Sequence, residues 1–325
     1  MLHTFLTNQW DLRYPIIGAP MAGVAHGRLA RAISQAGGLG MIGVGSATPV
    51  DLIAQEAAVV RGEDKNTKFG IGLMAWALAA RSELLDATIK AKPFLASVSF
   101  GNLAPYVERL HNVGIYVATQ VNTVEMAGVA EQAGVDLIVA QGTEAGGHTG
   151  QVGTLPLLQA VLEAVSVPVV AAGGVATVRG LAAALAAGAE GVWLGTAFLA
   201  SPESEATEGA RRRVVAARAD ETVLTAVFDR AQRLAWPARF PGRALRNGFT
   251  DRWHGHDGEL ARDDAAGEEL RRARDAGDYD LAYIYAGEAV GLIDAERPAG
   301  DIVRALGDGA EELLRGRYHH LFEDQ

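Results

Sequence analysis

The sequence predicts an α/β fold in which parallel strands close into a barrel. Between residues 14 and 200, short runs of valine, isoleucine, leucine and alanine alternate with segments of helical spacing. Runs this apolar on both faces are typical of parallel strands that helices cover. Eight such runs match the number of strands that closes a TIM (β/α)8 barrel. The predicted strands are 14–19, 39–44, 69–75, 94–100, 115–121, 135–140, 168–172 and 191–194.

The segments between these strands carry helix signals. Helical spacing predicts helices over 28–36, 49–60, 123–133 and 178–187. Thr48 and Pro49 suit the N-cap and the first turn of the second helix, and Ser82 suits the N-cap of the helix between the third and fourth strands. The alternative fold is a doubly wound open sheet. It is disfavoured because no Gly-x-Gly-x-x-Gly follows the first strand with an acid ending the second.

The composition of the sequence changes after Ser201. The following segment carries most of the arginine and many acids, and it includes the helical runs 208–217 and 267–276. A final amphipathic helix is predicted over 298–315. The predicted parts are a barrel over 1–201, a mostly helical cap on the substrate side over 202–280, and a C-terminal return to the barrel over 281–325.

The composition excludes several kinds of chemistry. The 325 residues contain no cysteine, so thiolate nucleophiles, disulfides, iron–sulfur clusters and cysteine-bound zinc are excluded. A net charge of −10 argues against nucleic acid or an anionic membrane as the main partner. His254 and His256 lack a third ligand at metal-binding spacing, so no metal site is predicted. The N-terminus lacks a signal-peptide pattern, and a cytoplasmic location is the expectation.

A glycine-rich stretch directly follows the sixth predicted strand. Residues 141–150 read Gln-Gly-Thr-Glu-Ala-Gly-Gly-His-Thr-Gly, and parallel barrels bind ligands at the carboxyl ends of their strands. The glycines allow the backbone to come close to a flat or anionic ligand. His148 is therefore the candidate catalytic residue, with a surface or structural histidine as the alternative. Glu144 could orient its imidazole, or serve as a carboxylate at a helix start.

Two other loops indicate a phosphate. Barrels commonly hold a phosphate between the loops after strands seven and eight, through backbone N–H groups and a hydroxyl. The candidates here are Gly173, Gly174, Gly195 and Thr196. Gln120 and Gln141 close the fifth and sixth strands, where a ring with alternating donors and acceptors would satisfy their amides. Since neither a thiol nor a metal site is predicted, a redox ring that bears a phosphate is the most economical ligand.

Five segments resemble the nitronate monooxygenase family, formerly called 2-nitropropane dioxygenases. They are PIIGAPMAGV (15–24), GGLGMIG (37–43), AQGTEAGGHTG (140–150), AAGGV (171–175) and GAEGVWLGTAF (188–198). The resemblance implies an FMN-dependent TIM barrel that oxidises alkyl nitronates with O2 to a carbonyl compound and nitrite. It also implies a small-molecule substrate, and a homodimer is compatible with it.

The resemblance assigns roles to individual residues. His148 falls on the catalytic histidine, which hydrogen-bonds the nitro group and removes the α-proton of a neutral nitroalkane. The implied FMN contacts are Ala19, Pro20 and Met21 along the isoalloxazine, Gly72, Gln120, Gln141 and Gly146 around the ring, and Gly173, Gly174, Trp193, Leu194, Gly195 and Thr196 at the phosphate end. Two residues depart from the pattern. Gly72 stands where many relatives have an asparagine, and Ala197 where an arginine is frequent.

The same sequence features are compatible with other functions. FMN-dependent enoyl-acyl-carrier-protein reductases and NAD(P)H-quinone reductases share the barrel and the glycine-rich stretch, and fold alone does not choose among them. An acyl-carrier partner would need a basic docking patch, for which the candidates are Arg211, Arg212, Arg213, Arg271, Arg272 and Arg274. A non-enzymatic barrel that binds a phosphorylated ligand is the alternative from a different class.

Overall fold

The computed structural model describes residues 1–322, with side chains through Arg317. Within this part of the chain, eight parallel strands form one sheet in the order β1-β9-β8-β6-β5-β4-β3-β2. They are β1 (Ile16–Gly18), β2 (Met41–Gly43), β3 (Gly70–Met74), β4 (Leu95–Ser99), β5 (Tyr116–Val121), β6 (Leu137–Gln141), β8 (Val169–Ala172) and β9 (Val192–Leu194). The predicted TIM barrel is confirmed.

The sheet closes between its first and second strands. Ile17 and Leu39 form a parallel bridge. The N–H of Gly18 donates to the carbonyl of Leu39 at 2.9 Å, and the N–H of Leu39 donates to the carbonyl of Ile16 at 2.9 Å. Short strands suffice because each is paired on both sides, which leaves no exposed edge.

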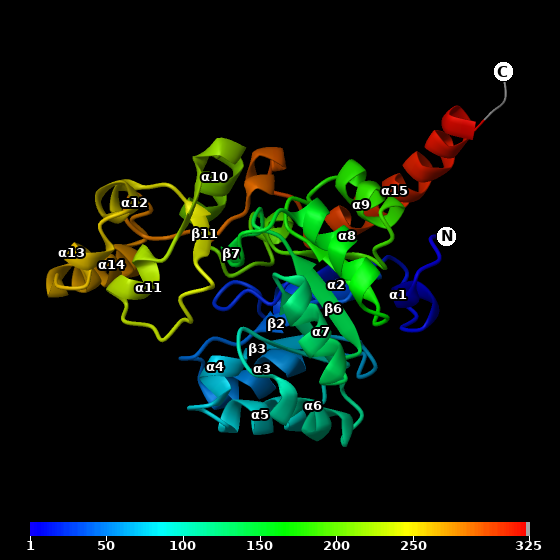
Figure 1. The fold of residues 1–325 in the computed structure, drawn as a ribbon, viewed down its shortest axis with the longest axis horizontal. Helices are drawn as coiled ribbons and strands as arrows, with labels where there is room; N and C mark the ends of the chain where they lie inside the picture. Colours follow the sequence, from blue (N-terminus) through cyan, green and yellow to red (C-terminus); the bar gives the residue numbers. More distant parts are fainter. Residues whose placement is uncertain (323–325) are drawn as a thin grey trace.

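Helices cover the outside of the barrel (Figure 1). They are α2 (Gly27–Gln35), α3 (Val50–Arg61), α4 (Ala75–Leu78), α5 (Glu83–Ala91), α6 (Ala104–His111), α7 (Val124–Gln132), α8 (Thr154–Ala164) and α9 (Val178–Ala186). A further short helix, α1 (Phe5–Asn8), precedes the first strand. Trp10 follows it and is buried against Phe94 and Tyr116, at the starts of β4 and β5. The amino-terminal end of the barrel is thus filled by side chains, which leaves the carboxyl end for a ligand.

Two predicted helix caps are wrong. Helix α3 has Pro49 as its N-cap, and the hydroxyl of Thr48 accepts a hydrogen bond from the N–H of Gly45 instead of capping the helix. Ser82 occupies the N-cap of α5, but its hydroxyl makes no capping bond. Its backbone is already helical at φ −60° and ψ −25°, and its carbonyl accepts the N–H of Leu85. A capping side chain needs the extended backbone that Ser82 lacks.

The segment after the barrel contains more strand than predicted. Its helices are α10 (Glu208–Ala216), α11 (Val227–Ala231), α12 (Gly248–Trp253), α13 (Asp257–Leu260) and α14 (Asp264–Ala276). Between them, β10 (Thr222–Thr225) and β11 (Gly242–Leu245) form a three-stranded antiparallel sheet with β7 (Gly147–His148) of the barrel loop. The whole segment lies on one side of the barrel (Figure 1). Its boundary at residue 201 stays a prediction.

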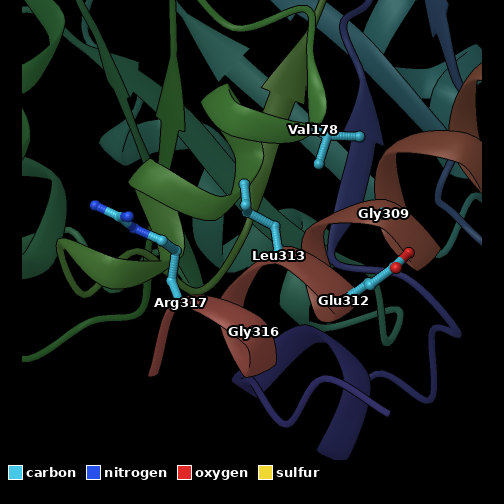
Figure 2. A pocket seen from close by; sticks show the side chains of 6 residues that line it. All are labelled: Val178, Gly309, Glu312, Leu313, Gly316 and Arg317. Atoms are coloured by element: carbon cyan, nitrogen blue, oxygen red, sulfur yellow. The ribbon is translucent and has the colours of Figure 1, made fainter. Parts of the chain in front are cut away.

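The chain returns to the barrel through 281–322, and residues 323–325 lie outside the described part. Ala286 and Val290 pack on Leu199 and Val214, and a 3-10 turn spans Glu288–Leu292. Helix α15 (Ala299–Phe322) then runs beside α9, and it is longer than the predicted 298–315. A shallow groove between these two helices places Val178 opposite Gly309 (Figure 2). Among the described helices, none is long and apolar enough to cross a membrane.

Helix α15 docks on the barrel through a glycine that has no room for a side chain. A Cβ at Gly307 would lie 2.0 Å from Cδ1 of Tyr14, whereas a Cβ at Gly316 in the same helix would meet nothing within 4 Å. We expect Gly307→Ala to lower the free energy of unfolding by about 1–3 kcal/mol because the helix must move off Tyr14. Gly316→Ala should raise it by up to about 1 kcal/mol through helix propensity alone. Urea unfolding of both variants tests this, and equal effects would contradict the packing.

Candidate active site

His148 belongs to a strand that the barrel and the following segment share. Residues 147 and 148 pair antiparallel with Arg243 and Gly242 of β11. The N–H of Thr149 continues the contact by donating to the carbonyl of Pro241 at 3.0 Å. Gly147 takes a φ of +73°, a conformation that suits glycine, so the loop can turn into this pairing directly after the barrel strand. The backbone of the candidate catalytic histidine is therefore held by its pairing with β11.

The imidazole of His148 contacts a buried carboxylate. Its Nε2 lies 2.9 Å from Oδ2 of Asp229, and the two side chains are only 9% and 6% exposed. The hydroxyl of Tyr285 donates to the other carboxylate oxygen, Oδ1, at 3.3 Å. Burial, followed by the charge of Asp229, raises the pKa of Tyr285 well above its usual range, so the phenol stays protonated. Tyr285, Asp229 and His148 thus form one hydrogen-bonded chain.

Glu144 does not contact His148. Its carboxylate accepts hydrogen bonds from the backbone N–H of Thr154 at 2.8 Å and from the hydroxyl of the same residue at 2.8 Å. Thr154 is the first residue of α8, where a carboxylate satisfies N–H groups that lack a partner within the helix. Of the two predicted roles for Glu144, the helix-start carboxylate is confirmed and the orientation of the imidazole is wrong.

Aromatic side chains surround His148. The ring of Trp236 stacks on the imidazole, with centroids 3.4 Å apart and planes 7° from parallel. Phe100 meets the edge of Trp236 at 5.1 Å, and Trp76 lies 5.3 Å from the same indole. Phe100 has a φ of +66° at the end of β4, which is rare for a bulky residue and typical of strained backbone at functional sites. Three aromatic side chains thus lie around the imidazole or its stacking partner.

The two glycine loops expose backbone N–H groups at the carboxyl ends of β8 and β9. Gly173 and Gly174 have φ values of +105° and +70°. Among the hydrogen bonds of the described residues, the N–H groups of Gly173, Gly174, Gly195 and Thr196 donate to no protein acceptor. The hydroxyl of Thr196 accepts the N–H of Gly287 at 2.9 Å and retains its own proton to donate. Such a set of free donors fits an anionic group such as a phosphate.

Two buried amides lie at the ends of neighbouring strands. Gln141 ends β6 and is 5% exposed. Asn122 directly follows β5, and its Nδ2 donates to the backbone carbonyl of Gln141 at 2.7 Å. Its Oδ1 has no partner among the described residues, which leaves one buried acceptor for a ligand or water. Gln120 is half-buried one residue before the end of β5. Asn122 is not among the predicted site residues, although it follows an apolar run in the same way as Gln141.

The remaining predicted contacts pack closely around the first strand. The ring of Pro20 fills the space beside Gly72, where a Cβ would lie 2.2 Å from Cγ of Pro20, so a longer side chain at 72 would displace it. Met21 touches the space beside Gly195, with Sδ 3.5 Å from a Cβ built there. The N–H of Ala19 donates to the carbonyl of Leu194 at 2.7 Å.

Three further residues of the predicted flavin site would contact a ligand through their backbone atoms. A Cβ at Gly146 would lie 2.6 Å from the N of Gly287, so the return segment rests directly on this glycine. Leu194 points into the core between strands and helices. Trp193 points into the barrel interior, where its Nε1 has no partner among the described residues.

The basic side chains that could form a docking patch are largely paired. Arg211 contacts Glu296 at 2.9 Å, and Arg212 contacts Glu208 at 3.1 Å. The other pairs are Arg271 with Asp275, and Arg274 with the side-chain oxygen of Gln232. Within residues that the structure describes, no group of three His, Asp or Glu side chains could hold a metal ion. His254 instead lies 3.1 Å from the hydroxyl of Thr225.

Comparison with known proteins identifies the family. The family model for nitronate monooxygenase matches residues 3–309. The chain belongs to the nitronate monooxygenase family. This is a family of flavin-dependent oxidoreductases. A Staphylococcus aureus protein that carries a provisional name as a nitronate monooxygenase is 30% identical, over 95% of this chain and 98% of its own. A Mycobacterium tuberculosis protein provisionally named a monooxygenase is 38% identical over 71% of this chain, which spans 62% of that protein.

Solved structures resemble this nitronate monooxygenase family member along nearly its whole length. FabK from Thermotoga maritima has a TM-score of 0.86 and 32% identity, covering 98% of this chain and 100% of its own. A nitroalkane oxidase from Streptomyces ansochromogenes has a TM-score of 0.82 and 32% identity, covering 96% and 99%. The enoyl reductase domain of MlnA from Bacillus amyloliquefaciens, at 15% identity and a TM-score of 0.76, shares the fold alone.

Arg243 ties the strand of His148 to the barrel loop in this family member. Its side chain is 10% exposed, and the guanidinium donates to the carbonyl of Thr143 at 2.7 Å and also bonds the hydroxyl of Thr222 and the carboxylate of Glu288. We expect Arg243→Met to lower the free energy of unfolding by about 1.5–3 kcal/mol through lost charged hydrogen bonds.

Arg212 offers the matched control for this prediction. It forms an ion pair with Glu208 in which both side chains are exposed, at 70% and 69%. Because such pairs contribute little, Arg212→Met should change the stability by less than about 1 kcal/mol. Urea unfolding of both variants measures the difference. Equal losses would contradict the tethering role of Arg243.

Proposed function

We propose that this chain is an FMN-dependent nitronate monooxygenase that oxidises alkyl nitronates with O2 to a carbonyl compound and nitrite. The observation that carries the proposal is the position of His148, a buried imidazole with Nε2 bound to a carboxylate and apolar rings around it. Family membership supports it. So does the likeness to a nitroalkane oxidase, which extends over nearly the whole chain at 32% identity.

The residues at the strand ends fit FMN as the flavin. The free N–H groups of the two glycine loops and the hydroxyl of Thr196 suit its phosphate. Trp193 and Leu194 would contribute through their backbone because their side chains point into the protein. The ring would lie against Ala19, Pro20, Met21, Gly72 and Gly146, with the amides of Gln120 and Gln141 facing its polar edge. Since Pro20 covers Gly72, the loss of the asparagine removes one contact without opening a hole.

The side chains around His148 would bind the substrate and handle its proton. A bound flavin supplies the electron transfer from the nitronate to O2. His148 accepts the α-proton when the substrate is a neutral nitroalkane, and it hydrogen-bonds the nitro group when the substrate is already ionised. The rings of Trp236, Phe100 and Trp76 exclude water and favour a small alkyl group.

We further propose small-molecule substrates and O2 as the reactants and the cytoplasm as the location, and a homodimer stays a prediction. The alternative is a reductase of the same superfamily that oxidises NAD(P)H. The surface gives it little support, because three of the six arginines expected to dock an acyl-carrier protein are paired with acids of this chain. The alternative therefore rests on the shared fold.

His148→Asn tests the proposed function. The variant should retain FMN, because no predicted flavin contact is lost, and its turnover of a neutral nitroalkane should fall by about 10²- to 10⁴-fold. Turnover of the pre-formed nitronate should fall much less, since that anion has no α-proton to lose. Steady-state nitrite release measures the loss of turnover with each of the two substrates.

His111→Asn is the control, since His111 forms a half-exposed pair with Asp136 away from the site. It should leave both activities unchanged. Unchanged turnover in His148→Asn would remove His148 from the mechanism, and a colourless variant would make it a structural residue. A wild-type protein that turns over neither substrate would contradict the proposed function itself.

A further inference from the structure

Asp229 is a buried carboxylate that lies outside the barrel, in a short helix of the following segment. It lies in α11, 81 residues after His148 in sequence, and its side chain is 6% exposed. Burying a charge is costly unless it is paired and hydrogen-bonded. Its two oxygens face the imidazole of His148 and the phenol of Tyr285, while Arg274 and Tyr283 are the other ionisable groups close enough to affect this cluster. One oxygen of the carboxylate therefore contacts the catalytic histidine, and the other contacts Tyr285.

The chemistry of the three groups fixes where their protons are. An ionised carboxylate only accepts hydrogen bonds, so both neighbours must donate to it. Tyr285 can do so because its phenol stays protonated. His148 must then carry its proton on Nε2 when neutral, which leaves the lone pair on Nδ1. Nδ1 has no hydrogen-bond partner among the described residues.

The imidazole cannot readily turn over within the site. The indole of Trp236 lies flat on one face at 3.4 Å, and the backbone of His148 is held in register with Gly242. Turning the ring over would point a carbon at Asp229 and leave a buried carboxylate oxygen without its donor, which is costly. The ring orientation, the tautomer and the reactive nitrogen are therefore set by the same contact.

We propose that Asp229, oriented by Tyr285, is a positioning residue that holds His148 as the Nε2–H tautomer and makes Nδ1 the atom that takes the substrate's α-proton. The proton step rests on the proposed function, whereas the tautomer does not. In that step the C–H bond breaks and its electron pair forms the C=N bond of the nitronate, while the π pair of the N=O bond moves onto that oxygen and the proton moves to Nδ1. The carboxylate of Asp229 then balances the charge of the imidazolium.

The tautomer can be measured without turnover. In holoprotein with 15N-labelled histidine, NMR of the neutral imidazole should show a protonated Nε2 and a bare Nδ1 at His148. Asp229→Asn should change this pattern, because an amide can donate to Nε2 as well as accept from it. A wild-type imidazole protonated on Nδ1, or a pattern unchanged in Asp229→Asn, would overturn the assignment.

Kinetics test the positioning role. Asp229→Asn should lower kcat for a neutral nitroalkane by about 10²-fold or more, with little change in KM, and should lower turnover of the pre-formed nitronate by less than about 10-fold. Asp136→Asn is the matched control, since Asp136 lies 2.8 Å from Nε2 of the exposed His111, and it should alter neither rate. Tyr285→Phe keeps the carboxylate and should cause a smaller loss in the same direction, which serves if Asp229→Asn does not fold.

The outcomes separate the two proposals. Equal losses with both substrates in Asp229→Asn, with the tautomer unchanged, would make Asp229 a structural residue and leave the proposed function intact. If the wild-type protein turned over neither substrate while the NMR pattern held, the proposed function would fail and the tautomer assignment would stand.

Discussion

The pairing of β7 with β11 is the contact on which the candidate active site depends. It is only two residues long, and it joins a loop at the carboxyl end of the barrel to a strand 94 positions further along, as the Gly242 to His148 register shows. Glycines also allow the return segment to pack directly on the two elements that this pairing joins. A Cβ at Gly242 would lie 2.5 Å from Cε1 of Tyr285, and one at Gly146 would lie 2.6 Å from the N of Gly287. The cap, the return segment and the barrel loop therefore meet in direct backbone contact around the histidine.

The two buried charged side chains near this strand pairing, Arg243 and Asp229, have different kinds of hydrogen-bond partner. Arg243 is satisfied by carbonyl, hydroxyl and carboxylate oxygens and ties the shared strand to the barrel. Among the described residues, Asp229 is satisfied by a phenol and an imidazole, a set that can respond when the imidazole gains a proton. The first arrangement favours rigidity and the second favours proton transfer. The indole of Trp236 covers one face of the imidazole in the second arrangement, and Phe100 packs against that indole.

The barrel and its histidine were readable from the sequence because both leave local signals. Apolar strands followed by glycine and polar residues identified His148 and Gln141. Asp229 left no such signal, since it comes 81 residues after its partner, and proximity in sequence favoured Glu144 instead. The strand Gly242–Leu245 was also missed, because Arg243 interrupts its four residues and Pro241 precedes them. Contacts made only after folding therefore account for most of what the sequence did not predict.

The most direct test is anaerobic visible spectroscopy of the purified protein, mixed separately with an alkyl nitronate and with NADH or NADPH. We expect a yellow protein whose flavin absorbance falls with the nitronate and does not change with either nicotinamide. Rapid bleaching by NAD(P)H, with no response to the nitronate, would contradict it in favour of a reductase. A colourless protein that FMN cannot reconstitute would contradict the flavin site itself.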